Sequence, residues 1–95
     1  MANLVITEDR STALLISLAQ SLALADAFPK ATARTILALS KATRAALVAQ
    51  EKNIALAHLE QISKTLVGED SIYADAVRRK VEQVAKAASF EPKFT

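Results

Sequence analysis

Residues 29–67 decide the fold, and they read PKATARTILALSKATRAALVAQEKNIALAHLEQISKTLV. After Pro29 this stretch has neither proline nor glycine, and it is rich in alanine, leucine, lysine and glutamate, which favour helix. Pro29 suits the first position of a helix, and Gly68 follows the stretch at a place where a left-handed cap is common. The sequence therefore predicts one central helix over about residues 29–67, roughly 58 Å long at 1.5 Å per residue.

The apolar pattern changes direction within this central stretch. At 100° per residue, the apolar residues of its first part share one face, and those of its second part point roughly 100° away. The first set is Ile36, Leu39, Leu47 and Ile54, and the second set is Leu59, Ile62 and Leu66. A break within residues 50–53 would explain this change and would give a four-helix bundle. We favour a continuous helix, because only Asn53 among these four residues is a turn former.

Two further helices are expected on either side of the central one. The first runs from a cap at Thr7 or Ser11 to Phe28, and its leucines recur every three to four residues. The last follows a cap at Asp70 or Ser71. Its apolar stripe consists of Tyr73, Val77, Val81, Val84 and Ala88. The fold class is all-α, with three helices around a long central helix, or a four-helix bundle if that helix breaks near 50–53. Residues 1–95 form a single domain, with an N-terminal arm at 1–6 and a C-terminal tail at 90–95.

Composition limits the classes of function. Hydrophobic residues make up 52% of the chain and aromatic residues 4%, while about a fifth of the residues are alanine. Alanine buries little area, so such helices depend on close approach and often on a second chain. The chain has no cysteine, which excludes disulfides and thiolate metal sites and is typical of a reducing, cytoplasmic compartment. Glu8 and Asp9 argue against a signal peptide, and no segment reads as a membrane span.

The geometry of a long central helix predicts self-association. One flanking helix would cover each half of it, which leaves each half as a two-helix layer with an open side. Leu39, Leu47 and Ile54 would then stay partly exposed, and monomers rarely expose large apolar patches. A two-fold homodimer, or a higher homo-oligomer, covers the same patch on each chain.

Charge placement is the most informative polar feature, although the net charge is only +2. No acidic residue occurs between Asp26 and Glu51. The cations of that interval fall within about 80° on a helical wheel, and one further lysine extends them. We call these residues the basic stripe: Lys30, Arg34, Lys41, Arg44 and Lys52. Such a stripe can contact nucleic-acid phosphates, an acidic protein surface or anionic lipid, although it is more often a solvated outer face. Residues 78–80, Arg-Arg-Lys, form a second basic cluster.

No residue pattern indicates catalysis or a cofactor. His58 is the only histidine, whereas a zinc site needs three or four ligands. The single glycine excludes a glycine-rich phosphate loop, and the carboxylates are scattered. We therefore predict no catalytic, cofactor-binding or metal-binding residues and consider His58 a packing or surface residue. The favoured function is a small non-enzymatic protein that binds a protein partner of unknown identity, as a regulator, inhibitor, adaptor or assembly subunit. The alternative is non-specific nucleic-acid binding through the basic stripe.

Overall fold

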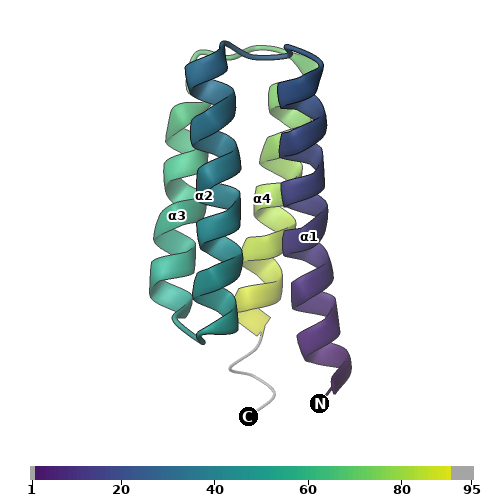
Figure 1. The fold of residues 1–95 in the computed structure, drawn as a ribbon. Coiled ribbons are helices and arrows are strands. Elements are labelled where there is room, and N and C mark those ends of the chain that lie inside the picture. Colours follow the sequence, from purple (N-terminus) through teal and green to yellow (C-terminus); the bar gives the residue numbers. More distant parts are fainter. Residues whose placement is uncertain (1, 91–95) are drawn as a thin grey trace.

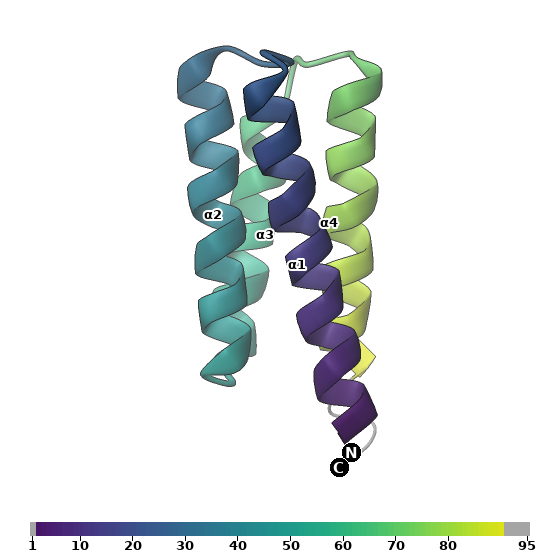
Figure 2. The same cartoon turned by 45° about the vertical axis from the view of Figure 1, so that its right-hand side comes forward.

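The computed structural model is a four-helix bundle in which each helix runs antiparallel to the next (Figure 1). The helices are α1 (Ala2–Leu24), α2 (Lys30–Val48), α3 (Lys52–Thr65) and α4 (Ile72–Phe90). The structure describes the backbone of residues 2–90 and the side chains of residues 10–88. Figure 2 shows α1 between α2 and α4, with α3 behind it. The α3–α4 pair makes the fewest close approaches among neighbouring helices.

The expectation of one continuous helix over residues 29–67 is wrong, and the four-helix alternative is confirmed. The chain reverses at residues 49–51 through Gln50, whose φ is 62°. The Glu51 N–H donates to the Ala46 carbonyl at 2.8 Å, and the Gln50 N–H donates to the Leu47 carbonyl at 3.0 Å. This is a Schellman cap, in which a left-handed residue satisfies the last carbonyls of a helix. Glycine usually occupies that position, which is why a glutamine there gave no turn signal.

The α1–α2 connection uses the same cap. Asp26 has a φ of 57°, and the Ala27 N–H donates to the Leu22 carbonyl at 3.0 Å. The first helix therefore ends at Leu24 and not at the expected Phe28, whose side chain instead folds into the core at 6% exposure. Pro29 is extended, with φ −53° and ψ 147°, and leads directly into α2. At the start of α4, Ser71 is the cap, since its Oγ accepts the Ala74 N–H at 3.1 Å.

Buried residues recur at spacings of three or four in all four helices. They are Thr12, Leu15, Ala19 and Leu22 in α1; Ala33, Ile36, Ser40, Thr43 and Ala46 in α2; Ala55, Leu59, Ile62 and Leu66 in and after α3; and Ala74, Val77, Val81, Val84 and Ala88 in α4. This is the spacing of bundle helices that pack side chains as in coiled coils. The stripe expected for the last helix is confirmed from Val77 onward, whereas Tyr73 is 44% exposed and Ala74 takes its place.

Two hydroxyl residues of α2 lie in the core without losing their hydrogen bonds. Ser40 Oγ donates to the Ile36 carbonyl and Thr43 Oγ1 donates to the Leu39 carbonyl, each at 2.7 Å. Burial of a hydroxyl is costly only when it lacks a partner. Local bonding to the preceding turn therefore allows these small side chains to face the neighbouring helices.

Two further expectations concern the N-terminal arm and the C-terminal tail. Helix α1 begins at Ala2, so the segment expected as an arm at residues 1–6 is helical from Ala2 onward. No proline or glycine precedes Leu24, so nothing in the sequence interrupts the helix there. Phe90 is the last residue of α4, and residues 91–95 of the expected tail lie outside the described residues. No helix in the described part of the chain has the length and apolar character needed to cross a membrane.

Candidate interaction face on α1 and α2

The structure divides the basic stripe between two helices. Lys30, Arg34, Lys41 and Arg44 are all exposed on α2, and we call them the cation row. Lys52 is partly buried at the start of α3, because the chain reverses at Gln50. The structure therefore keeps four of the five expected residues in one row and separates the fifth.

The cation row belongs to a second regular stripe on α2, beside the stripe that faces the core. Its members recur at spacings of four, three, four, three and four residues. They are Lys30, Arg34, Leu37, Lys41, Arg44 and Val48. Residues at these spacings lie above one another on a helix, so the four cations and the two aliphatic residues share one face.

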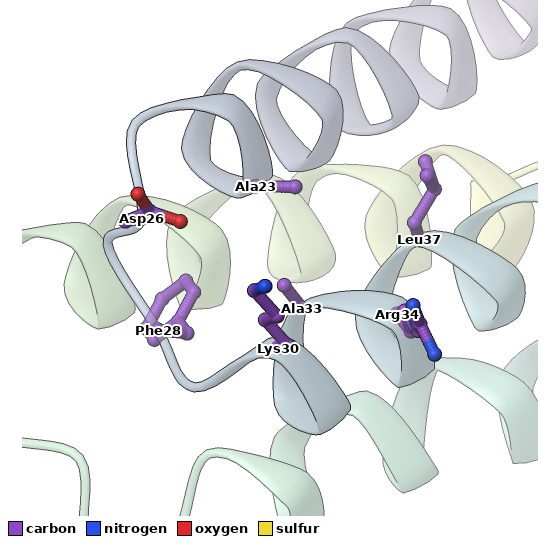
Figure 3. Close-up of a pocket in the computed structure, with 7 residues that line it drawn as sticks. All are labelled: Ala23, Asp26, Phe28, Lys30, Ala33, Arg34 and Leu37. Atoms are coloured by element: carbon purple, nitrogen blue, oxygen red, sulfur yellow. The ribbon is translucent and has the colours of Figure 1, made fainter.

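A depression of about 190 Å³ lies at the connection end of this stripe (Figure 3). Ala23 of α1 lines it, together with Asp26 and Phe28 of the connection. The α2 residues that line it are Lys30, Ala33, Arg34 and Leu37. Asp26 is the only acidic residue among these seven, and the remaining surface is alanine, leucine and phenylalanine between cationic side chains.

A second, more open depression of about 490 Å³ continues along the same two helices. Ile16 and Gln20 of α1 line one side. The α2 side consists of Lys41, Arg44, Ala45 and Val48. Because Ile16, Gln20 and Ala23 are also spaced by four and three, both depressions follow one line between the helices. We call this line the α1–α2 groove.

The outward side of α1 next to the groove carries no charge. From residue 11 to residue 25 the sequence has no acidic or basic side chain. The exposed residues in this range are Ala13, Leu14, Ser17, Gln20, Ser21, Leu24 and Ala25. Leu14 is 46% exposed and Leu24 is 87% exposed. We refer to the α1–α2 groove and this outward side of α1 together as the α1–α2 face.

The surface of α3 and α4 is different, because acids and bases alternate on it. Lys64 Nζ lies 3.4 Å from Glu60 Oε1 on α3. On α4, Arg78 Nη1 donates to Asp75 Oδ1 at 2.9 Å. Opposite charges one helical turn apart are typical of a solvated helix surface.

Arg78 belongs to the second basic cluster at residues 78–80, and it also has a structural function that the sequence did not indicate. Its Nη2 donates to the Leu66 carbonyl at 2.9 Å and to the Glu69 carbonyl at 3.0 Å. These carbonyls lie at and beyond the C-terminal end of α3, where the backbone lacks helical partners. The guanidinium therefore fastens the α3–α4 connection to α4.

The residues expected to mediate self-association do not form one exposed face. Leu39 and Leu47 on α2 are partly buried and pack against the core of the bundle, whereas Ile54 on α3 is 45% exposed. Because the chain reverses at Gln50, neighbouring helices of the same chain cover the segment that was expected to be one central helix. The geometric reason for a dimer is therefore removed. Self-association stays a prediction.

His58 is partly buried on α3. Within residues 10–88, whose side chains the structure describes, no three histidine or carboxylate side chains converge in a way that could hold a metal ion. Every buried side-chain nitrogen and oxygen atom of these residues has a hydrogen-bond partner. The described core thus shows no unsatisfied polar atom that points to a ligand.

Several residues of the α1–α2 face were missed from the sequence, namely Ile16, Gln20, Leu37 and Val48. Two signals could have found them: the second stripe of three- and four-residue spacings on α2, and the long uncharged run on α1. No protein-family model, curated protein or solved structure matches this chain significantly.

Proposed function

We propose that this chain is a small non-enzymatic protein that acts by binding another protein through the α1–α2 face. A regulator, inhibitor, adaptor or assembly subunit would work in this way. The observation that carries the proposal is the uncharged outward side of α1 beside the cation row of α2. The outer side of a helix in a bundle is ordinarily charged and polar. The outer side of α1 departs from this pattern, because it carries no charged residue from residue 11 to residue 25, and this supports a surface that another molecule covers.

Nucleic acid is the second candidate partner, because the cation row is exposed and its four residues share one side of α2. If all four side chains contacted phosphates of duplex DNA, the logarithm of the binding constant would fall with the logarithm of salt with a slope of about −3.6, at roughly −0.9 per contact. We favour a protein partner, because phosphates would leave the aliphatic residues of the groove, such as Ile16 and Leu37, without a binding role.

The proposal assigns no catalytic residue. Substitution of His58→Ala should therefore leave partner binding unchanged apart from any effect on stability. Homodimer formation is a separate proposal, and sedimentation equilibrium of the 10.2 kDa chain at high micromolar concentration decides it. A compact monomer at that concentration would exclude the homodimer and leave partner binding through the α1–α2 face intact.

Site-directed photo-crosslinking tests the proposed face directly, since the chain has no native cysteine. Ser17→Cys places a thiol on the outward side of α1, and Ser63→Cys places a matched thiol on the exposed side of α3. Each variant is labelled with benzophenone maleimide and irradiated in lysate of the source cells, with and without nuclease. We expect a protein adduct from Ser17→Cys that survives nuclease and is absent from Ser63→Cys.

Two results of this experiment would contradict the proposal. Equal adducts from both positions, or none from either, would mean that the α1–α2 face is not a specific protein-binding surface. An adduct from Ser17→Cys that disappears with nuclease would favour the nucleic-acid alternative.

A further inference from the structure

We propose that the α1–α2 groove receives an acidic amphipathic helix of the partner protein. This inference rests on the proposed function and names the element that would fill its binding surface. The groove combines an apolar floor with a cationic edge, and both run along the helix axes. An amphipathic helix that lies in a groove presents the complementary arrangement.

The length of the groove fits a helix of ordinary size. Its lining on α2 runs from Lys30 to Val48, which corresponds to about 27 Å at 1.5 Å per residue. A bound helix of about 18 residues spans that distance. The floor carries Ala23, Ala33 and Ala45, and such small side chains allow a third helix to approach closely.

The cations along the edge of the groove determine where the incoming helix should carry its acidic residues. Arg34 and Lys41 are seven residues apart, which is two helical turns, and Arg44 follows after three more. Carboxylates at the same spacing on the incoming helix would lie opposite these cations. Asp26 is the single acid of the lining, and it lies at the connection end. The acids of the partner should therefore concentrate over Arg34, Lys41 and Arg44, with an uncharged or basic residue over Asp26.

A second copy of this chain does not supply such a helix. The exposed side of α4 mixes Asp75 and Glu82 with Arg79 and Lys86, so its cations would meet the cation row. The exposed side of α3 pairs Glu60 with Lys64. Among the described residues, no helix presents acids without nearby bases. Charge complementarity thus favours a different protein.

The experiment uses designed probes and the whole chain. The first probe is a fluorescent 18-residue helical peptide with leucine at heptad spacing and glutamate on both flanks. The second has lysine in place of every glutamate, and the third is a fluorescent 20-base-pair DNA duplex. Fluorescence anisotropy at low salt should show binding of the glutamate peptide at least about tenfold tighter than binding of the lysine peptide, a difference of about 1.4 kcal/mol.

Matched charge-reversal variants on α2 and α4 show which helix binds the glutamate peptide. Arg34→Glu with Lys41→Glu should weaken binding of the glutamate peptide about tenfold or more. Arg79→Glu with Lys86→Glu makes the same changes at the same seven-residue spacing on α4 and should alter it less than about twofold. Leu37→Ser should also weaken it several-fold, because the floor contributes by apolar contact. Circular dichroism establishes that each variant remains helical.

Three outcomes would overturn the inference. They are no binding of the glutamate peptide, equal weakening by the two double substitutions, and binding of the duplex alone, which would favour phosphate contact. If the peptide fails while Ser17→Cys still captures a protein, the occupant is wrong and the proposed function stands. If both fail, the α1–α2 face does not bind protein.

Discussion

The α1–α2 hairpin and the α3–α4 hairpin line the core with the same three- and four-residue spacings, but their outer surfaces differ. On α3 and α4, acids and bases lie within one helical turn of each other, as in the Glu60–Lys64 and Asp75–Arg78 pairs. On α1 and α2, charge is separated, because α1 is uncharged from residue 11 to residue 25 and α2 carries cations only. Both hairpins therefore satisfy the needs of the fold, and both expose some large apolar side chains, but they distribute charge differently over their outer surfaces.

This difference is not explained by stability. Exposed ion pairs contribute about 0–1 kcal/mol each, so the mixed charges of α3 and α4 are not required to hold the bundle. Leaving four cations on α2 without an acid on the same helix gives no stabilising pair within it. The separation of charge on the first hairpin supports the proposal of a binding surface there, and the predictions below test how far the two hairpins differ.

The largest expected effect is the loss of stability when a core isoleucine is truncated, and it should be the same in both hairpins. Ile36 on α2 is 1% exposed and Ile62 on α3 is fully buried. Ile36→Ala and Ile62→Ala should each lower the free energy of unfolding by about 2–5 kcal/mol, since each leaves a cavity in the core. Urea denaturation followed by circular dichroism measures both. If one of them costs less than about 1 kcal/mol, the hairpins do not share one core and the comparison fails.

The next effect should separate the arginines of the two hairpins. Arg78→Met removes the guanidinium that binds the Leu66 and Glu69 carbonyls and should cost about 1–3 kcal/mol of stability. Arg34→Met, on the exposed side of α2, should change stability by less than about 0.5 kcal/mol. Thermal and urea unfolding of the pair decide this. A loss of similar size in both would show that the cation row also holds the fold together.

A smaller effect, of opposite sign, concerns the link between the hairpins. Gln50 has a φ of 62°, a conformation that costs a non-glycine residue about 1–2 kcal/mol. Gln50→Gly removes this cost and loses about 0.5–1 kcal/mol in chain entropy, so it should stabilise the protein by about 0.5–1 kcal/mol. Gln50→Val, a β-branched residue, should destabilise it. If glycine destabilised the protein at this position, the left-handed cap would not be the cause of the reversal.

The sequence predicted the helical class and most of the core spacing, because both follow from the repeat of apolar residues. It did not place the reversal, because the left-handed residue is Gln50 and the sequence there lacks glycine and proline. The sequence does contain one signal of the break, which is a shift of the apolar face by roughly 100° between Leu47 and Leu59. The direction of an apolar face was thus more informative than the residue types at the turn.

The candidate face was predicted only in part for a related reason. The cation row could be identified because its members lie on one helix and their spacing is periodic. Ile16 and Gln20 lie on another helix, and they join Lys41 and Arg44 only after the chain turns at Asp26. Which stripe of α1 lies beside which stripe of α2 depends on that turn. Tertiary contacts of this kind have no sequence pattern of their own.

The central claim is that the α1–α2 face is a protein-binding surface and that the α3–α4 surface is not. Chemical-shift mapping of the ¹⁵N-labelled chain, titrated with the acidic peptide described above, tests this claim most directly. We predict that the largest amide shifts lie at Ile16, Gln20, Leu37 and Lys41, and that the exposed side of α3 around Glu60 and Lys64 hardly responds. Shifts centred on α3 and α4, or spread evenly over all four helices, would contradict the account.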